Sequence, residues 1–354
     1  MEIKENIPLA PFTTLHIGGP ARYFVEVANE QELAETLTFT REKNLPVFVL
    51  SGGSNILVSD RGFSGLVIRP IIKGREILED SSDYVRIRVG AGEVLDELIA
   101  WTVENNWWGL ENLSFIPGLT GALAIQNVGA YGQEASEVIE GVEVMDRFGH
   151  ELKIMSNSEC GFMYRHSRFN TNDKNKYIIL RINLRLKKNG KPNLSYKDVA
   201  NYFGGRTPKQ GELRDAIIEI RKKKGQDPNQ VWSAGSFFSN FRLTDQQFES
   251  LCKKIREDFG VEKESELLEL VKKVAAPSDG DKTKVPAAWI LDQLLGLKGK
   301  QVGKAKLSDK QVLNMINVGG ATAADCIELF HQVRDIVREK TGLELVNEPE
   351  FVGF

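Results

Sequence analysis

The first 70 residues alternate between short apolar runs and one amphipathic run, and this order restricts the fold more than any other feature. The apolar runs predict strands over 23–27, 47–50 and 65–69. An amphipathic helix is predicted over 29–44, with Asn29 as its N-cap. The order strand, helix, strand, loop, strand is typical of an α/β unit.

The rest of the chain predicts strands mainly in its middle and helices mainly in its last third. Strands are predicted over 84–89, 142–146, 151–155, 177–186 and 343–354. Helices are predicted around 95–99 and over 213–224, 244–258, 264–275 and 322–340. The last helix places Cys326 on its apolar face, and a polar stretch over 277–282 predicts a loop. At about 150 residues per domain, 354 residues predict two or three domains.

Charge and cysteine content exclude several classes of protein. The 49 acidic and 46 basic residues give a net charge of −3, so the concentrated positive field of a dedicated nucleic-acid-binding protein is missing. No apolar run approaches a membrane span, and the N-terminal residues lack the apolar core of a signal peptide. Cys160, Cys252 and Cys326 are too far apart for a metal motif or a disulfide framework. We therefore expect a cytoplasmic protein that binds no metal, nucleic acid or membrane.

Two glycine-rich segments are candidates for binding an anion. Residues 51–55 directly follow an apolar strand, and residues 116–132 are small and nearly uncharged. Glycine lets backbone N–H groups approach a phosphate closely. Two such loops without a P-loop lysine favour a diphosphate held by backbone dipoles, as in a flavin dinucleotide; the alternative is two ordinary loops. Gly90 and Gly92 lack the third glycine of a dinucleotide fingerprint and predict a tight strand-to-helix turn.

Four further features could carry chemistry, and each has a plainer alternative. Residues 164–168 hold two arginines and could clamp a carboxylate or phosphate, or form an exposed loop. The basic residues 221–224 could anchor a substrate diphosphate, or simply end a helix. Ser236, beside two phenylalanines, could donate a proton to a carbanion, or lie in a turn before a buried aromatic pair. Glu350 could act near a site, although most such glutamates are surface residues.

Six segments, in this order along the chain, resemble the UDP-N-acetylenolpyruvoylglucosamine reductase family. They are residues 14–21, 51–55, 116–132, 164–167, 234–238 and 348–350. The most specific are the run from Pro117-Gly118 to Gly129-Ala130-Tyr131-Gly132 and the run Gly235-Ser236-Phe237-Phe238. The resemblance spans nearly the whole chain. The chain length and residues 194–198 resemble the longer, type I subtype, whereas Ala122 and Ala124 depart from the usual flavin loop.

The resemblance implies an α+β flavoprotein of three domains. Two α/β domains would bind FAD in a fold like that of the vanillyl-alcohol-oxidase (PCMH-type) flavoproteins, and a C-terminal α/β domain would bind substrate. The implied boundaries are 1–69, completed by 345–354, then 70–212 and 213–344. In the longer subtype the third domain has a split βαββ fold, and an extra loop carries a substrate-side tyrosine.

The resemblance also implies the reaction. NADPH would reduce non-covalently bound FAD and leave, and the hydride would then pass to UDP-N-acetylglucosamine enolpyruvate, giving UDP-N-acetylmuramate. Arg165 and Glu350 would stabilise the enolate-like charge, and Ser236 would protonate the adjacent carbon. The product would serve peptidoglycan and cell-wall synthesis, and through it cell shape and cell division. The protein would act as a monomer.

The resemblance assigns the remaining site positions. Those implied to contact FAD are Gly52, Gly53, Ser54, Asn55, Pro117, Gly118, Thr120, Gly121, Ala122, Gln126, Asn127, Gly129, Ala130, Tyr131 and Gly132. Those implied to contact the nucleotide-sugar substrate are Tyr196, Lys224, Asn240 and Gln293. Lys224 suits the UDP diphosphate or NADPH. Two alternatives stay open: an FAD-dependent alcohol or lactone oxidase of the same superfamily, and a non-catalytic nucleotide-sugar-binding protein.

Overall fold

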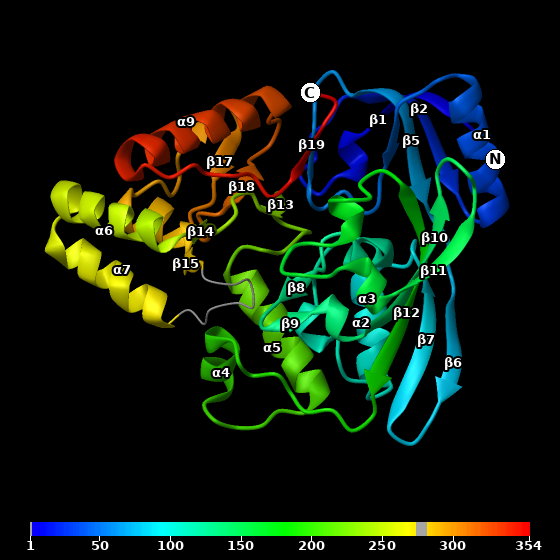
Figure 1. Cartoon of the computed structure of the whole chain (residues 1–354), viewed down its shortest axis with the longest axis horizontal. Helices are drawn as coiled ribbons and strands as arrows, with labels where there is room; N and C mark the ends of the chain where they lie inside the picture. The colour runs from blue at the N-terminus through cyan, green and yellow to red at the C-terminus, as the bar shows by residue number, and fades with distance from the viewer. Residues whose placement is uncertain (1, 274–281) are drawn as a thin grey trace. The chain divides into compact units, whose positions relative to one another are not determined.

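The computed structural model describes residues 2–273 and 282–354 (Figure 1). The contacts between its residues divide the chain into two compact units. Unit 1 consists of Met1–Pro8, Pro20–Gly53 and Gly62–Lys223, and unit 2 of Leu9–Gly19, Ser54–Arg61 and Lys224–Phe354. The loop predicted over 277–282 lies outside the described residues except for Lys282.

The first sheet of unit 1 confirms the predicted α/β start of the chain. Its strand order is β1-β2-β5-β3, with β1 (Lys4–Pro8), β2 (Pro20–Val27), β5 (Phe63–Pro70) and β3 (Val47–Val49). Strands β2 and β3 run parallel to β5, and helix α1 (Glu30–Glu42) buries Leu33 and Leu37 in the core that these strands share. Helix α1 begins where predicted, because the Asn29 side chain accepts a hydrogen bond from the Glu32 N–H (2.9 Å).

The second sheet of unit 1 is antiparallel and contains the strands predicted in the middle of the chain. Its order is β11 (Leu152–Ser156), β10 (Ile139–Asp146), β12 (Tyr177–Lys187), β7 (Tyr84–Gly90) and β6 (Arg75–Asp80). Helix α2 (Leu95–Glu104) follows β7 after the tight turn predicted at Gly90 and Gly92. A Cβ on Gly92 would lie 2.4 Å from the Ile71 carbonyl carbon, so this turn requires glycine.

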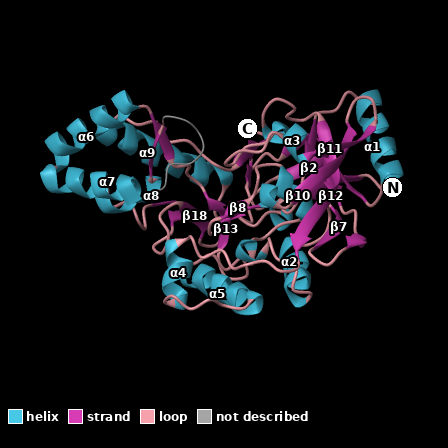
Figure 2. Cartoon of the chain, turned by 60° about the horizontal axis from the view of Figure 1, so that its bottom comes forward, coloured by secondary structure: helices cyan, strands magenta, loops and turns pink. Residues whose placement is uncertain are grey.

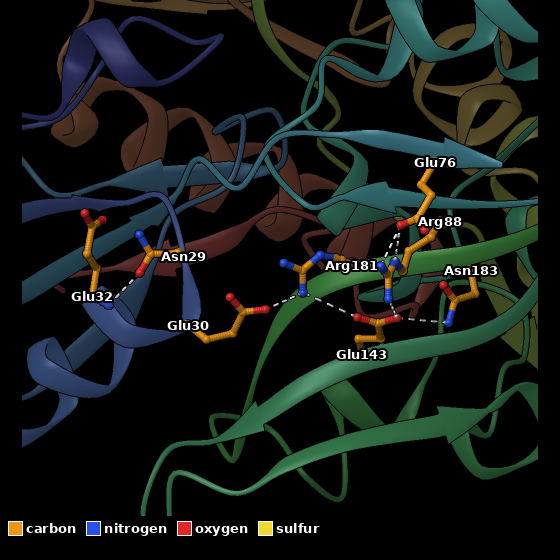
Figure 3. Close-up of polar contacts among 8 residues, drawn as sticks. All are labelled: Asn29, Glu30, Glu32, Glu76, Arg88, Glu143, Arg181 and Asn183. Atoms are coloured by element: carbon orange, nitrogen blue, oxygen red, sulfur yellow. Dashed lines mark hydrogen bonds and ion pairs between the residues drawn. The ribbon is translucent and has the colours of Figure 1, made fainter. Parts of the chain in front are cut away.

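A row of alternating charges crosses the second sheet and reaches helix α1 (Figure 3). Arg181 on β12 pairs with Glu30 at the start of α1 and with Glu143 on β10 (3.4 Å). Arg88 on β7 pairs with Glu143 (3.8 Å) and with Glu76 (2.6 Å). The hydrogen bond from Arg181 lowers the pKa of Glu30. This row therefore joins α1, which packs on the first sheet, to the second sheet.

The main strands and helices of unit 1 are connected by short elements, several of which contribute to the candidate site. They include η2 (Glu111–Leu113), η3 (Thr120–Ala124), β8 (Gly129–Ala130), β9 (Gln133–Glu134), η4 (Ala135–Glu137), α3 (Asn157–Cys160) and η5 (Arg168–Asn170). Helices α4 (Lys197–Phe203) and α5 (Gln210–Lys223) lie side by side and share a small core (Figures 1 and 2). Helix α5 confirms the helix predicted over 213–224.

Unit 2 combines short strands with longer helices around one core. Its strands are β13 (Trp232–Ser236), β18 (Asn314–Asn317), β17 (Ala305–Leu307), β16 (Gln301–Val302), β14 (Phe241–Leu243), β15 (Thr283–Val285), β4 (Ile56–Val58) and β19 (Glu350–Val352). The helices are α6 (Asp245–Phe259), α7 (Val261–Lys273), α8 (Ala287–Trp289), the π-helical η6 (Ile290–Leu294) and α9 (Ala323–Thr341); a short helix η1 (Ala10–Phe12) precedes them. Helices α6, α7 and α9 match the predicted ones, although the last residues predicted for α7 lie outside the described chain.

Two predictions about the end of the chain have different outcomes. Cys326 lies fully buried on α9, as predicted, and burial raises the pKa of its thiol to about 12. The strand predicted over 343–354 was too long, because β19 covers only Glu350–Val352. Pro349 has no N–H to donate to a ladder, so it separates β19 from the irregular residues before it. None of the described helices is long and apolar enough to cross a membrane.

Candidate active site

The two glycine-rich loops meet inside unit 1. Gly52 follows β3, and a Cβ on it would lie only 2.4 Å from the Gly118 Cα. The two backbones therefore touch at a point that excludes any other residue at Gly52. Gly53 and Gly118 have φ values of 60° and 129°, which also favour glycine. In the part of the chain that the structure describes, the buried Ser51 hydroxyl beside this contact has no hydrogen-bond partner.

The first half of the second loop is fastened to the turn before α2. The Thr120 hydroxyl and N–H both donate to the Glu93 carbonyl (3.0 and 2.8 Å), and the Gly121 N–H donates to the Ala91 carbonyl (3.0 Å). Thr120 is fully buried, and a Cβ on Gly121 would lie 2.8 Å from the Ala91 Cβ. These contacts fix the path of the loop and leave little freedom in its backbone.

The second half of the loop is joined to the Tyr-Arg-His-Ser segment, which the sequence suggested as a separate clamp. The Ser167 hydroxyl donates to the Ile125 carbonyl (2.6 Å), and Arg165 Nη1 donates to the Gly129 carbonyl (3.1 Å). Asn127, which is 1% exposed, bridges the same elements by donating to the Met163 carbonyl (3.1 Å). The predicted flavin loop and the predicted catalytic arginine thus form one structure.

The end of the loop contacts a predicted substrate residue. The Tyr131 carbonyl accepts a hydrogen bond from Asn112 Nδ2 (2.8 Å), and the Gly132 carbonyl accepts one from Asn193 Nδ2 (2.7 Å). The Tyr196 ring packs edge-on against the Tyr131 ring, with 5.2 Å between centroids. Tyr196 is 42% exposed and lies beside the loop.

The positions predicted to contact FAD differ in their exposure. The side chains or backbones turned into the protein belong to Gly53, Thr120, Gly121, Asn127 and Tyr131. The partly exposed positions are Gly52, Ser54, Asn55, Pro117, Gly118, Ala122, Gln126, Gly129 and Ala130, and Gly132 is exposed. The loop therefore anchors itself with its side chains and offers mainly backbone and small residues to its surroundings.

An ion pair that sequence reasoning missed supports the start of the second loop. Arg214 on α5 holds Asp96 on α2 through two hydrogen bonds (2.6 and 2.9 Å). Asp96 also accepts the Phe115 N–H (2.6 Å), and Phe115 has φ +65° directly before the loop. Burial acts to raise the pKa of Asp96, but Arg214 and the Phe115 N–H together hold it below its usual value. Asp96 and Arg214 are 118 residues apart, so no local pattern could have paired them.

The two-arginine clamp suggested by residues 164–168 is wrong in one respect. Arg168 pairs with Asp173 and also donates to the Glu159 carbonyl (2.9 Å), so it holds its own loop together. In the basic run at the end of α5, Lys223 pairs with Glu219 (2.6 Å). The functional hypotheses for these two runs therefore concentrate on Arg165 and Lys224.

Ser236 lies in unit 2 at the end of β13, where the strand is irregular. The register against β18 shifts by one residue between Ser233 and Ser236, which is a β-bulge, and Gly235 inside it has φ +77°. Ser236 is partly exposed, whereas the Phe237 and Phe238 rings behind it are buried and pack edge-on at 5.5 Å. The aromatic pair anchors the strand, and the bulge sets the direction of Ser236.

Glu350 begins β19 and lies next to the segment that follows Ser236. The Glu348 N–H donates to the Phe237 carbonyl (2.9 Å), and the Glu350 N–H donates to the Asn55 carbonyl (3.0 Å). The Glu350 side chain is exposed. Within unit 2, the end of the first glycine loop, the Ser236 segment and the Glu350 segment are therefore held together by backbone hydrogen bonds.

The other predicted substrate positions of unit 2 have varied surroundings. Lys224 is partly exposed directly after α5, and Gln293 is exposed on η6 with Nε2 bound to Asp292 (2.8 Å). Asn240 is partly exposed, and its Oδ1 accepts the Ala287 N–H (3.1 Å). Of the predicted catalytic and substrate residues, only Arg165 and Tyr196 belong to unit 1 among those described.

Comparison with known proteins identifies the family. An FAD binding domain model matches residues 21–154, and a model of the UDP-N-acetylenolpyruvoylglucosamine reductase C-terminal domain matches residues 227–352. The UDP-N-acetylenolpyruvoylglucosamine reductase of Thermobifida fusca is 37% identical over 98% of this chain and 97% of its own length. The chain belongs to the UDP-N-acetylenolpyruvoylglucosamine reductase family. A family member from Bdellovibrio bacteriovorus is 35% identical over 99% of both chains.

A solved structure of another family member has a similar fold. The crystal structure of UDP-N-acetylenolpyruvylglucosamine reductase from Thermus caldophilus covers 99% of each chain with a TM-score of 0.66, at 24% sequence identity. The α+β fold class predicted from the sequence is therefore confirmed, and so is the family that the six sequence segments indicated.

Proposed function

We propose that the protein is an FAD-dependent reductase that converts UDP-N-acetylglucosamine enolpyruvate to UDP-N-acetylmuramate, for peptidoglycan synthesis. The observation that carries the proposal is the backbone contact between Gly52 and Gly118. It joins two loops of the region matched by the FAD binding domain model. Membership of the reductase family supplies the substrate and the direction of the reaction.

The residues of unit 1 fit an FAD diphosphate. A diphosphate held by backbone dipoles needs close approach and N–H groups, and the Gly52–Gly118 contact provides glycine backbone on both loops. The buried Ser51 hydroxyl adds a donor that no described residue uses. We assign the partly exposed positions of both loops, and the exposed Gly132, to direct FAD contact. Thr120, Gly121 and Asn127 then shape the loop from inside.

Bound FAD would supply hydride transfer from NADPH to the terminal methylene carbon of the enolpyruvyl group. The residues of this chain supply the rest of the chemistry. Arg165, as a cation, and Glu350, as a carboxylic acid that donates a hydrogen bond, bind the substrate carboxylate region, where negative charge accumulates, and stabilise that charge more strongly as it grows. Ser236 then gives its proton to the carbon next to the carboxylate.

We extend the proposal to the substrate contacts and to the architecture of the chain. Lys224, Tyr196, Asn240 and Gln293 contact the nucleotide sugar, and Lys224 faces a diphosphate. The chain has the longer, type I architecture, with domains 1–69 completed by 345–354, 70–212 and 213–344. It works as a cytoplasmic monomer that holds FAD without a covalent bond.

Anaerobic half-reactions test the proposal. The purified protein should be yellow and should release FAD on acid or heat denaturation. NADPH should bleach the flavin, and UDP-N-acetylglucosamine enolpyruvate should restore it with formation of UDP-N-acetylmuramate. Reoxidation by oxygen with an alcohol or lactone as the reducing substrate would indicate the oxidase instead. Binding of the nucleotide sugar without any change in the flavin spectrum would indicate a binding protein.

A further inference from the structure

The segment Thr14–Gly19 contributed to the family resemblance, but the proposed reaction gives it no task. In the structure it belongs to unit 2, where Leu15 and Ile17 are buried in the main core. Asn317 Nδ2 on β18 donates to the Leu15 carbonyl (3.1 Å). Residues near the start of the chain are therefore built into the sheet that carries Ser236.

Thr14 makes a two-way contact with the strand that leads to Ser236. Its hydroxyl donates to the Ser233 carbonyl (2.7 Å), and its own carbonyl accepts the Ser233 N–H (3.0 Å). Next to this contact, the His16 ring stacks on the Trp232 ring with 4.5 Å between centroids. Both neighbouring residues of β13 are thus held by the same N-terminal segment.

The Ser233 side chain in turn holds the bulge. The Ser233 Oγ accepts the Gly235 N–H (3.0 Å), which sets the left-handed turn at Gly235 (φ +77°). On the other side of Ser236, the Phe237 N–H donates to the Leu313 carbonyl (2.7 Å). The backbone of Ser236 is therefore restrained from both directions, and Thr14 controls one of them.

We propose that Thr14 is a positioning residue for the proton donor Ser236. By holding Ser233, it fixes the β-bulge that directs the Ser236 hydroxyl. This proposal rests on the proposed function, because it assumes that Ser236 delivers a proton. A misplaced donor slows proton delivery without changing the steps that precede it.

The chain offers a matched control in the adjacent threonine. The Thr13 hydroxyl is buried, but its partners are local: it donates to the Ala10 and Ile17 carbonyls (3.1 and 3.2 Å). Thr13→Val and Thr14→Val remove the same atom from neighbouring positions. Thr14→Ser keeps the hydroxyl and removes only a methyl group.

Stopped-flow measurement of the two half-reactions tests the proposal. Thr14→Val should be reduced by NADPH at close to the wild-type rate but reoxidised by the enolpyruvyl substrate about 10- to 100-fold more slowly. Its solvent deuterium isotope effect on reoxidation should increase, because proton delivery becomes limiting. Thr14→Ser should restore most of the rate. Thr13→Val should lower the Tm without this selective slowing.

Hydrogen exchange separates failure of this proposal from failure of the proposed function. Measured on the flavin-loaded protein without substrate, Thr14→Val should speed exchange in residues 232–238, whereas Thr13→Val should act on residues 10–17. Unchanged exchange in 232–238, or equal slowing of both half-reactions in Thr14→Val, would overturn the positioning role. A wild-type protein that the enolpyruvyl substrate does not reoxidise would overturn the proposed function, and the exchange result would still decide whether Thr14 holds the bulge.

Discussion

The second glycine loop and the Ser236 bulge differ in the partners that hold them and in what they present. The loop is held directly by partners at moderate separations along the chain, such as Arg165 and Ser167, which lie 36 and 42 residues from the carbonyls they bind. The bulge is held by a partner 219 residues away, at Thr14. The loop offers mainly backbone, whereas the bulge presents one particular side chain, Ser236.

Because of this difference, we expect substitutions in the two regions to have different effects. A backbone surface depends on shape, so substitutions in the loop should weaken flavin binding through added atoms. A directed side chain depends on position and acidity, so substitutions around the bulge should slow one chemical step while flavin binding stays intact.

Ser236→Ala should give the largest change. It removes the proposed proton donor, and loss of general acid catalysis typically costs about 10²–10⁴-fold in rate. Reduction by NADPH should stay near the wild-type rate, and reoxidation by the enolpyruvyl substrate should slow by that factor in stopped-flow traces. Similar slowing of both half-reactions would mean that Ser236 is needed mainly for packing beside Phe237.

Glu350→Gln should give the next largest change. The substitution keeps the size of the side chain and removes the acid, and loss of one group that stabilises developing charge costs roughly 10²–10³-fold. Because the Glu350 side chain is exposed, the Tm should not change. Only the reoxidation rate should fall.

Deleting residues 345–354 is the comparison that shows whether Glu350 has a role beyond structure. The deletion removes the β19–β4 pairing and the buried side chains of Leu345 and Val352. Since burying each such side chain contributes about 1.5–3 kcal/mol, the truncated protein should have a clearly lower Tm. Full turnover by the truncated protein would contradict both roles of this segment.

Gly52→Ala should weaken FAD binding by a smaller factor. The added Cβ would meet the Gly118 Cα at 2.4 Å, and backbone cannot move aside as a flexible side chain can. Overpacking of about 1–3 kcal/mol corresponds to roughly 5- to 150-fold weaker FAD binding, measured by fluorescence titration. Gly211→Ala is the control, because a Cβ there meets no atom within 4 Å in the described structure. Unchanged FAD affinity in Gly52→Ala would show that the two loops do not form the FAD surface.

Asp96→Asn should have the smallest effect and a distinctive pH dependence. The folded-state pKa of Asp96 is lowered, so the ionised form stabilises the fold above the ordinary aspartate pKa and this stabilisation is lost as pH falls through the folded value. Wild-type Tm should therefore fall in acid more steeply than that of Asp96→Asn. At neutral pH the variant should lose about 2 kcal/mol of stability.

The matched control for Asp96 is Glu212, which lies on α5, the helix that carries Arg214. Glu212→Gln removes the charge of an exposed partner of Arg206 (2.8 Å), and exposed ion pairs contribute little to stability. Its Tm should be almost unchanged at every pH. Equal pH profiles for Asp96→Asn and the wild type would show that the Asp96–Arg214 pair does not support the fold.

The sequence predicted the longer strands of unit 1 and the long helices because their apolar residues recur with a regular period. The short strands of unit 2, such as β4, β17 and β18, were not predicted. Strands β1 and β6 were missed, since their residues are mostly exposed and carry no apolar period. Strand β19 was predicted too long, because apolar residues before Pro349 pack in the core without forming a ladder. Apolar periodicity therefore does not predict edge strands or irregular core segments, even in a chain whose main sheets it does predict.

The features of the candidate site also differ in whether the sequence alone could identify them. Its glycine loops could be found from local composition, because the need for small residues shows in the sequence itself. The Asp96–Arg214 pair and the Thr14–Ser233 contact could not, since their partners are 118 and 219 residues apart and each residue alone is ordinary. Folding brings them together, and only the structure shows which partner each one has.

The most direct test uses two variants, Ser236→Ala and Gly52→Ala. The FAD affinity of each is measured by titration, and the reoxidation rate of each is measured at saturating FAD. The account predicts that Ser236→Ala changes only the reoxidation rate and that Gly52→Ala changes only the FAD affinity. If each variant instead changes both quantities to a similar extent, the division between a backbone surface for the flavin and a directed proton donor is wrong.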